Sequence, residues 1–175
     1  MDIVFVDGSI IPLHRHGGGA LKKKKGLQSI GRGRKRLGTT MHLSITTNSF
    51  IICQLFPAQR QDCKTVEQLW QDWPWEKIGF VVADKGYDNG NIRNFIKSKN
   101  AVPVIPYKGV YLPNDSTLTP EDFYDTKLYR KRHIIERLFG RLKENKRIAM
   151  RFDKLDSTFL SFITLALSKA YKLFC

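Results

Sequence analysis

Two aspartates and a glutamate stand at positions in this sequence where a carboxylate could bind a metal ion or another cation. Asp7 interrupts an apolar, β-branched run at residues 2–11, and Asp84 directly follows a second apolar run at residues 78–83. Glu136 lies in a segment rich in arginine and leucine. A buried carboxylate costs free energy unless it is paired or bound to a metal. The alternatives are a turn that ends the first strand at Asp7 and a plain surface ion pair at Glu136.

Glu136 belongs to a set of polar residues on one predicted helix. Residues 129–143 contain no proline, and leucine and isoleucine recur there at helical spacing. We therefore expect one long amphipathic helix that ends near Arg151. At about 100° per residue, four side chains fall within a sector of roughly 60°, beside the apolar stripe. These are Tyr129, Arg132, Glu136 and Lys143.

The composition favours a polyanionic partner. The chain has 175 residues, 42% of them hydrophobic, which suffices for one domain over residues 1–175. Thirty lysines and arginines against sixteen acidic residues give a formal net charge of +14, which points to nucleic acid. No apolar run reaches membrane-spanning length and three cysteines show no zinc spacing, so we expect a soluble intracellular protein with reduced cysteines.

Basic residues gather in a segment without apolar periodicity, residues 14–38, which we interpret as a loop inserted after the first strand. Two clusters separated by glycine could follow a phosphate backbone, although such runs are often only solvated surface. His14 and His16 lack an acidic or cysteine partner nearby, so phosphate contact or simple exposure is the favoured role. The clustered cations are Lys22, Lys23, Lys24, Lys25, Arg32, Arg34, Lys35 and Arg36.

The remaining patterns predict a mixed α/β fold. We expect strands at residues 2–11, a hairpin of residues 39–47 and 50–56, a strand at 78–83 and an edge strand at 101–106. Helices are expected at residues 63–70, 91–97 and 159–167, besides the one that carries Glu136. Trp70, Trp73 and Trp75 are expected to pack in the core. This order predicts a ribonuclease H-like, mixed five-stranded sheet flanked by helices.

These motifs resemble those of the DDE transposases of bacterial insertion sequences. The last motif of one group in that family, Tyr-x2-Arg-x3-Glu-x6-Lys, is matched at every spacing by Tyr129, Arg132, Glu136 and Lys143. The segments 7–9, 30–42, 83–88 and 147–155 resemble the first Asp motif, the basic loop with the second strand, the second Asp motif and the tail after the Glu helix. The resemblance covers nearly the whole chain.

The resemblance implies a site and a reaction. Asp7, Asp84 and Glu136 would be the catalytic residues and the ligands of two Mg²⁺ ions, about 3.5–4 Å apart, for which Mn²⁺ would substitute. The site would nick DNA to free the element's 3′ end and then transfer that end into target DNA. Tyr129, Arg132 and Lys143 would contact DNA near the cut. The implied partners are the element ends, the target DNA and, on DNA, a second copy of the chain.

The sequence departs from the family pattern in two places. The first predicted strand begins at once, so we expect the N-terminal DNA-recognition domain to be absent and an upstream-frame polypeptide to supply it. In the basic loop, Lys35 and Arg36 replace small residues and Met41 replaces a lysine. The alternative is a truncated, non-catalytic DNA-binding remnant of such a transposase. In either case the expected location is the bacterial cytoplasm, at the nucleoid.

Overall fold

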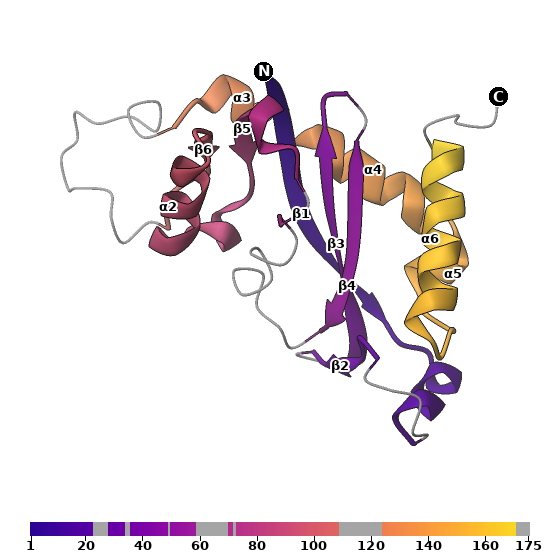
Figure 1. Ribbon diagram of the computed structural model, residues 1–175. Helices are drawn as coiled ribbons and strands as arrows, with labels where there is room; N and C mark the ends of the chain where they lie inside the picture. Colours follow the sequence, from indigo (N-terminus) through magenta and orange to yellow (C-terminus); the bar gives the residue numbers. More distant parts are fainter. Residues whose placement is uncertain are drawn as a thin grey trace. The chain divides into compact units, whose positions relative to one another are not determined.

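The computed structural model describes residues 1–22, 28–33, 36–48, 50–58, 70–71, 73–108 and 124–170 (Figure 1). Strands and helices follow the predicted α/β order. The strands are β1 (Asp2–Pro12), β2 (Gly31–Arg32), β3 (Leu37–Thr46), β4 (Ile51–Pro57), β5 (Ile78–Val82) and β6 (Val102–Val104). The helices are η1 (Arg15–Lys22), η3 (Trp75–Lys77), η4 (Lys85–Tyr87), α2 (Gly90–Ser98), α3 (Thr126–Arg130), α4 (His133–Lys143), α5 (Lys146–Ala149) and α6 (Asp156–Ala170).

The strands form one mixed sheet in the order β2-β3-β1-β5-β6, and β4 also pairs with β3. β1 runs parallel to β5, and β5 runs parallel to β6, which is the edge strand that the prolines predicted. The mixed α/β class is thus confirmed. Within the described residues the sheet has six strands and not five, because Gly31 and Arg32 of the basic segment pair antiparallel with Gly38 and Leu37.

The chain divides into two compact units. Unit 1 comprises Met1–Asp7, Leu43–Ile52 and Gln61–Ile135. Its core joins the two central parallel strands to α2 through Trp70 and Trp73, whose rings lie 5.7 Å apart. Trp75 packs against both rings and is only partly buried. The predicted core role of the three tryptophans is confirmed.

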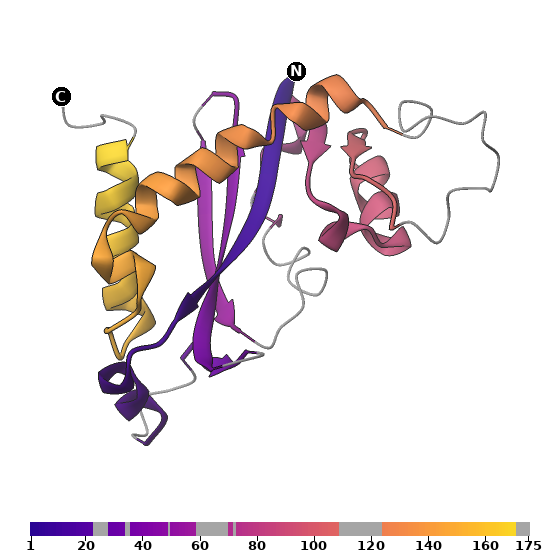
Figure 2. The same ribbon diagram turned by 180° about the vertical axis from the view of Figure 1, so that it is seen from behind.

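Unit 2 comprises Gly8–His42, Cys53–Arg60 and Glu136–Cys175. α5 packs against α6, as both views show (Figures 1 and 2). Burial of Phe159, Ile163 and Leu167 at helical spacing fixes the inner face of α6. None of the helices in the described ranges has the length and apolar character needed to span a bilayer.

Several local predictions need correction. The prediction of a loop over residues 14–38 is wrong in part, because residues 15–22 form the 3₁₀ helix η1 and β3 already begins at Leu37. The turn alternative at Asp7 is wrong, since β1 continues without interruption to Pro12. The predicted helix at residues 63–70 lies, except for Trp70, outside the described residues.

The single helix predicted to run from Tyr129 to near Arg151 is broken twice. Between α3 and α4, the amides of Lys131, Arg132 and Ile134 bond to carbonyls three residues back. The His133 ring, through Nδ1, lies 2.8 Å from the Arg130 carbonyl oxygen, the group that Ile134 N–H would reach in an α-helix. The second break follows Lys143, where the Asn145 side chain accepts a hydrogen bond from the Arg147 amide and begins α5.

Candidate functional site

Two of the three candidate carboxylates lie on neighbouring parallel strands within unit 1. Phe5 of β1 lies opposite Val82 of β5. Asp7 and Asp84 each stand two residues further along, so the same register directs both side chains to one face of the sheet. Both residues are partly exposed, whereas Phe5 and Val82 are buried. The carboxylates therefore share one face of the sheet, with Asp7 midway along β1 and Asp84 two residues after the end of β5.

The opposite face of these strands is closed by the tryptophan core. Val4 and Val6 of β1, with Val81 and Ala83 of the β5 segment, alternate with the carboxylate positions and all belong to the core cluster. Because side chains alternate across a strand, the packing of these four residues fixes the direction of the other set. The hydrophobic pattern thus places Asp7 and Asp84 on the face opposite the tryptophan core.

Asp84 also shapes the turn that follows β5. Its carboxylate accepts a hydrogen bond of 2.8 Å from the Gly86 amide, and its carbonyl accepts one of 3.1 Å from the Tyr87 amide. A Cβ at Gly86 would lie 2.8 Å from Asp84 Oδ1, which is closer than van der Waals contact allows. Gly86 therefore permits the approach that holds the carboxylate in place, and the buried Tyr87 anchors the turn below it.

A phenol from α3 and a cation from the turn that follows α3 interact with the two aspartates. Arg132 Nη2 lies 3.3 Å from Asp7 Oδ2, and both side chains are less than one-fifth exposed. Burial raises the pKa of the Tyr129 phenol, and the negative charge of Asp84 raises it further, against the opposing effect of Arg132, which also donates a hydrogen bond to it. Asp7, Asp84, Tyr129 and Arg132 are therefore one electrostatic group in unit 1.

The second aspartate of the Asp84 motif, Asp88, has a structural role that the sequence reasoning missed. Its carboxylate accepts bonds of 2.8 Å from the Arg93 guanidinium and from the Lys108 amide. Arg93 also donates to the Ile105 carbonyl at 2.7 Å and lies over the Tyr107 ring. This network ties α2 to the segment after β6. The five-residue spacing of an acid and an arginine across a helix start is the signal that could have found it.

The other predicted site residues lie elsewhere in the chain. Glu136 is exposed in the first turn of α4 and belongs to unit 2, as does Lys143, the exposed last residue of that helix. Arg32 ends β2 and is exposed, and Arg36 is exposed just before β3. Lys22 is the last residue of η1. Lys23, Lys24, Lys25, Arg34 and Lys35 lie outside the described residues.

Within the described ranges, no group of three histidine, cysteine, aspartate or glutamate side chains is arranged to hold a metal ion. The donor types still fit a hard cation, because Asp7 and Asp84 offer carboxylate oxygens on one face and Asp7 already pairs with the guanidinium of Arg132. His42, by contrast, is buried in unit 2 on β3, where burial lowers its pKa to about 4.

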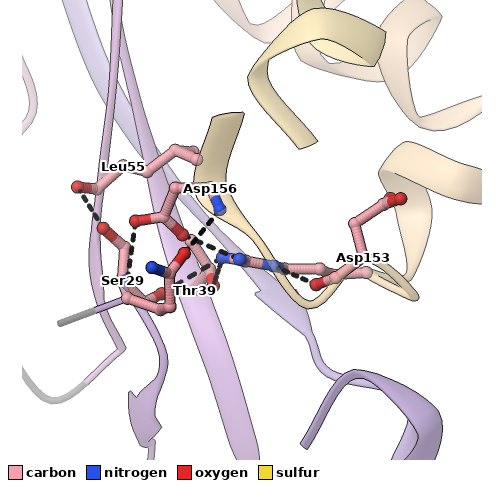
Figure 3. Close-up of polar contacts among 7 residues, drawn as sticks. Ser29, Thr39, Leu55, Asp153 and Asp156 are labelled. Atoms are coloured by element: carbon pink, nitrogen blue, oxygen red, sulfur yellow. Dashed lines mark hydrogen bonds and ion pairs between the residues drawn. The ribbon is translucent and has the colours of Figure 1, made fainter. Parts of the chain in front are cut away.

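A buried arginine organises unit 2. Arg151 is fully buried and donates to Asp156 Oδ1 at 2.7 Å, to Thr39 Oγ1 at 2.8 Å and to the Asp153 carbonyl at 2.9 Å (Figure 3). The other Asp156 oxygen accepts the Ser29 amide at 2.8 Å. The tail that follows α5 is thereby fastened to the start of β3 and to the residues before β2. Residues 147–155 were singled out in the sequence, but this role was not.

Comparison with known proteins identifies the family. The model of the transposase DDE domain family matches residues 1–168. The chain belongs to this family.

A curated relative, "Putative transposase for insertion sequence element IS6501" from Brucella ovis, is 34% identical over 89 residues, which are 51% of this chain and 64% of that protein. The match thus spans less than two thirds of that relative. The crystal structure of the catalytic core domain of BIV integrase aligns with a TM-score of 0.43 and 14% identity, covering 95% of this chain and 81% of that one.

Membership of the DDE family confirms the resemblance that the Tyr-Arg-Glu-Lys spacing indicated. The match runs through β1, β5 and α4, so it includes Asp7, Asp84 and Glu136. It supports a function in transposition. The family thus gives a context for the carboxylates of unit 1, whose neighbours Arg132 and Tyr129 belong to the same motif as Glu136.

Proposed function

We propose that this chain is the catalytic domain of an insertion-sequence transposase, which cleaves DNA strands and transfers the freed 3′ ends into target DNA. One observation carries the proposal: Asp7 and Asp84 share one face of the sheet at two neighbouring parallel strands and form one electrostatic group with Arg132 and Tyr129. Such a group suits phosphodiester chemistry, which needs carboxylates for hard cations and positive charge for phosphate.

In this proposal Asp7, Asp84 and Glu136 hold two Mg²⁺ ions, with Mn²⁺ as a substitute. When bound, the two ions supply an activated water or 3′-hydroxyl and stabilise the leaving oxygen. The protein contributes fixed ligand directions. The register of β1 and β5 sets the directions of the Asp7 and Asp84 side chains, and the hydrogen bond from the Gly86 amide holds the Asp84 carboxylate. Glu136 contributes its ligand from the first turn of α4.

Arg132 and Tyr129 position the phosphate in this proposal. Arg132 is a guanidinium in contact with Asp7, so it both balances that carboxylate and presents further N–H donors to a phosphate oxygen. The Tyr129 phenol is protonated at neutral pH even at its ordinary pKa, which burial raises further, so it can donate a hydrogen bond. Both groups therefore orient the scissile phosphate without taking part in proton transfer.

The remaining cations bind the DNA backbone in this proposal. Lys143 joins Tyr129 and Arg132 near the cut, and the basic segment follows the flanking phosphates through Lys22, Lys23, Lys24, Lys25, Arg32, Arg34, Lys35 and Arg36. A net charge of +14 supports a strongly salt-dependent affinity. The proposed partners are element ends and target DNA at the bacterial nucleoid, a second copy of the chain on DNA, and an upstream-frame polypeptide that recognises the ends.

Nicking of supercoiled plasmid tests the proposal. The purified chain is incubated with Mg²⁺, with Mn²⁺ or with EDTA, beside Asp84→Asn, Glu136→Gln and the control Glu144→Gln. Glu144 is also exposed and directly follows α4, so its replacement removes the same charge close by on the chain. We expect nicking that needs the metal, falls roughly 100-fold or more in Asp84→Asn and Glu136→Gln, and persists in Glu144→Gln.

Two other results would reject the catalytic role. Nicking that survives in Glu136→Gln would remove that residue from the site. If the wild-type chain binds DNA in a salt-sensitive way but does not nick it, even with the upstream polypeptide added, the chain is a DNA-binding remnant. Affinity measured at 50 and 200 mM salt separates binding from cleavage.

A further inference from the structure

Three aromatic rings gather at the surface of unit 2, and none of them belongs to a predicted catalytic residue. His14 stacks on Phe152 with ring centres 4.5 Å apart and an interplanar angle of 29°. His16 meets His14 edge-on at 4.6 Å. Phe152 remains 39% exposed although it is a large apolar side chain. We call His14, His16 and Phe152 the aromatic platform.

The backbone holds this platform in place. The His14 amide donates to the Arg151 carbonyl at 2.8 Å, and the Arg151 amide donates to the Pro12 carbonyl at 2.9 Å. Leu13 and Arg151 form a parallel bridge, and η1 lies beside this part of the tail in both views (Figures 1 and 2). The platform is therefore a fixed feature, set by main-chain bonds between two distant segments.

The neighbours of Phe152 explain why its ring faces outward. Arg151 and Asp153 are both buried, so the alternation of an extended segment turns Phe152 to the solvent. Arg151 is fixed by the Asp156 and Thr39 bonds described above (Figure 3). An outward position in such a segment ordinarily favours a polar residue, since an exposed ring keeps its apolar surface in water.

Positive charge surrounds the platform. Arg15 is exposed between the two histidines, and Lys154 is exposed two residues after Phe152. The Lys154 side chain runs along Gly19, with its ammonium nitrogen 3.7 Å from the position of a Cβ there. An exposed ring with exposed cations nearby in the chain is a combination that binds single-stranded nucleic acid, in which bases stack and phosphates meet positive charge.

We propose that Phe152, backed by His14, stacks on an unpaired base of the DNA, while Arg15 and Lys154 contact the phosphates on either side. This inference rests on the proposed function in taking DNA as the partner, and adds that the DNA is held with a base out of the helix. The ring has no hydrogen-bonding group, so the platform accepts any base. The platform belongs to unit 2, and the aspartates belong to unit 1.

The test compares two fluorescent DNA probes with the full chain. One is a fully paired duplex, and the other is the same duplex with one unpaired 2-aminopurine, whose fluorescence is quenched when it stacks. The variants are Phe152→Leu, which keeps apolar volume but removes the ring, and Phe152→Trp, which keeps a stacking face. Phe50→Leu is the matched control, because Phe50 is a comparably exposed phenylalanine outside the platform, at 48%.

We expect Phe152→Leu to weaken binding of the unpaired-base probe roughly 5- to 100-fold and to abolish the quenching, with duplex affinity changed less than about twofold. Phe152→Trp should restore both readouts, and Phe50→Leu should match the wild-type chain. Unchanged quenching in Phe152→Leu, or an equal loss for both probes, would overturn the platform. Neither result bears on plasmid nicking, whose failure in the wild-type chain would instead reject the proposed catalytic function.

Discussion

Replacing Arg151 by methionine should remove most of the stability of unit 2. Methionine is unbranched like the apolar stem of arginine but has no donor, so the variant loses the bonds to Asp156, Thr39 and the Asp153 carbonyl together. Arg151 has no exposed surface, so water cannot replace these bonds without opening the structure. The carboxylate of Asp156 and the hydroxyl of Thr39 are left without their principal donor.

The magnitude follows from this geometry. Breaking a buried ion pair by removing one partner costs about 3–5 kcal/mol. Asp156 is 24% exposed and keeps the bond from the Ser29 amide, which places the expected cost near the lower end, about 3 kcal/mol. With a urea dependence of about 2 kcal/mol per molar, the midpoint of unfolding should fall by roughly 1.5 M. That is a large part of the stability of an ordinary domain.

Urea unfolding followed with two probes shows which unit loses stability in Arg151→Met. The fluorescence of Trp70, Trp73 and Trp75 reports on unit 1, and amide exchange along the first half of β3 reports on unit 2. Arg151→Met should therefore expose the β3 amides at lower urea than the tryptophans. If this variant does not accumulate, Arg151→Lys should show the same order of events with a smaller shift, because lysine keeps the charge but not the bidentate reach.

Two matched variants control for the loss of an arginine as such. Arg93→Met removes a second buried guanidinium, which bonds to Asp88 and Ile105, and should affect the tryptophan signal first. Arg141→Met removes an exposed guanidinium from α4 and should change the midpoint by less than about 0.3 M. A shift below 0.3 M in Arg151→Met would refute the view that this residue fastens unit 2.

Two further predictions follow from single positions. Gly86→Ala should lower plasmid nicking roughly 10- to 100-fold, because the new Cβ displaces the end of the Asp84 side chain. The free energy of unfolding should change by less than about 1 kcal/mol, since only that side-chain end moves. Equal nicking by the variant and the wild-type chain would contradict this prediction. The pKa of His42 is about 4 in the folded chain and about 6.5 when unfolded, so the unfolded chain binds the proton first as the pH falls. Between pH 7.5 and 5.0, the free energy of unfolding of the wild-type chain should therefore drop by roughly 2 kcal/mol more than that of His42→Leu. Urea midpoints at the two pH values measure both drops, and an equal drop in the two proteins would show that His42 does not titrate in this way.

Much of the fold was predictable because its signals are local. The apolar runs at residues 2–11 and 78–83 identified the two central strands, and the prolines beside Val102 and Val104 indicated an edge strand. Period-two alternation needs only neighbouring residues, since each side chain's face depends on its parity in the strand. The same alternation decided the faces of Asp7 and Asp84 once the register was known.

The helix that carries Glu136 shows where local signals fail. Its apolar spacing continues through residues 128–149, so periodicity alone predicts one element. The break at residues 131–132 comes from a side chain that competes with the backbone, the His133 ring at the Arg130 carbonyl. At the second break, Asn145 is a typical N-cap residue for a new helix. The prediction followed the continuous apolar spacing instead and therefore missed the start of α5.

By itself, the sequence determined the family, the central strands and the identity of the candidate carboxylates, since spacing and residue type are written along the chain. Only the tertiary structure decided that Arg132 meets Asp7 across 125 residues and that Arg151 meets Thr39 across 112. Many cations in this basic chain could have served either acceptor. The choice depends on which segments the sheet register and the packed helices bring together, a property of the fold that no local pattern contains.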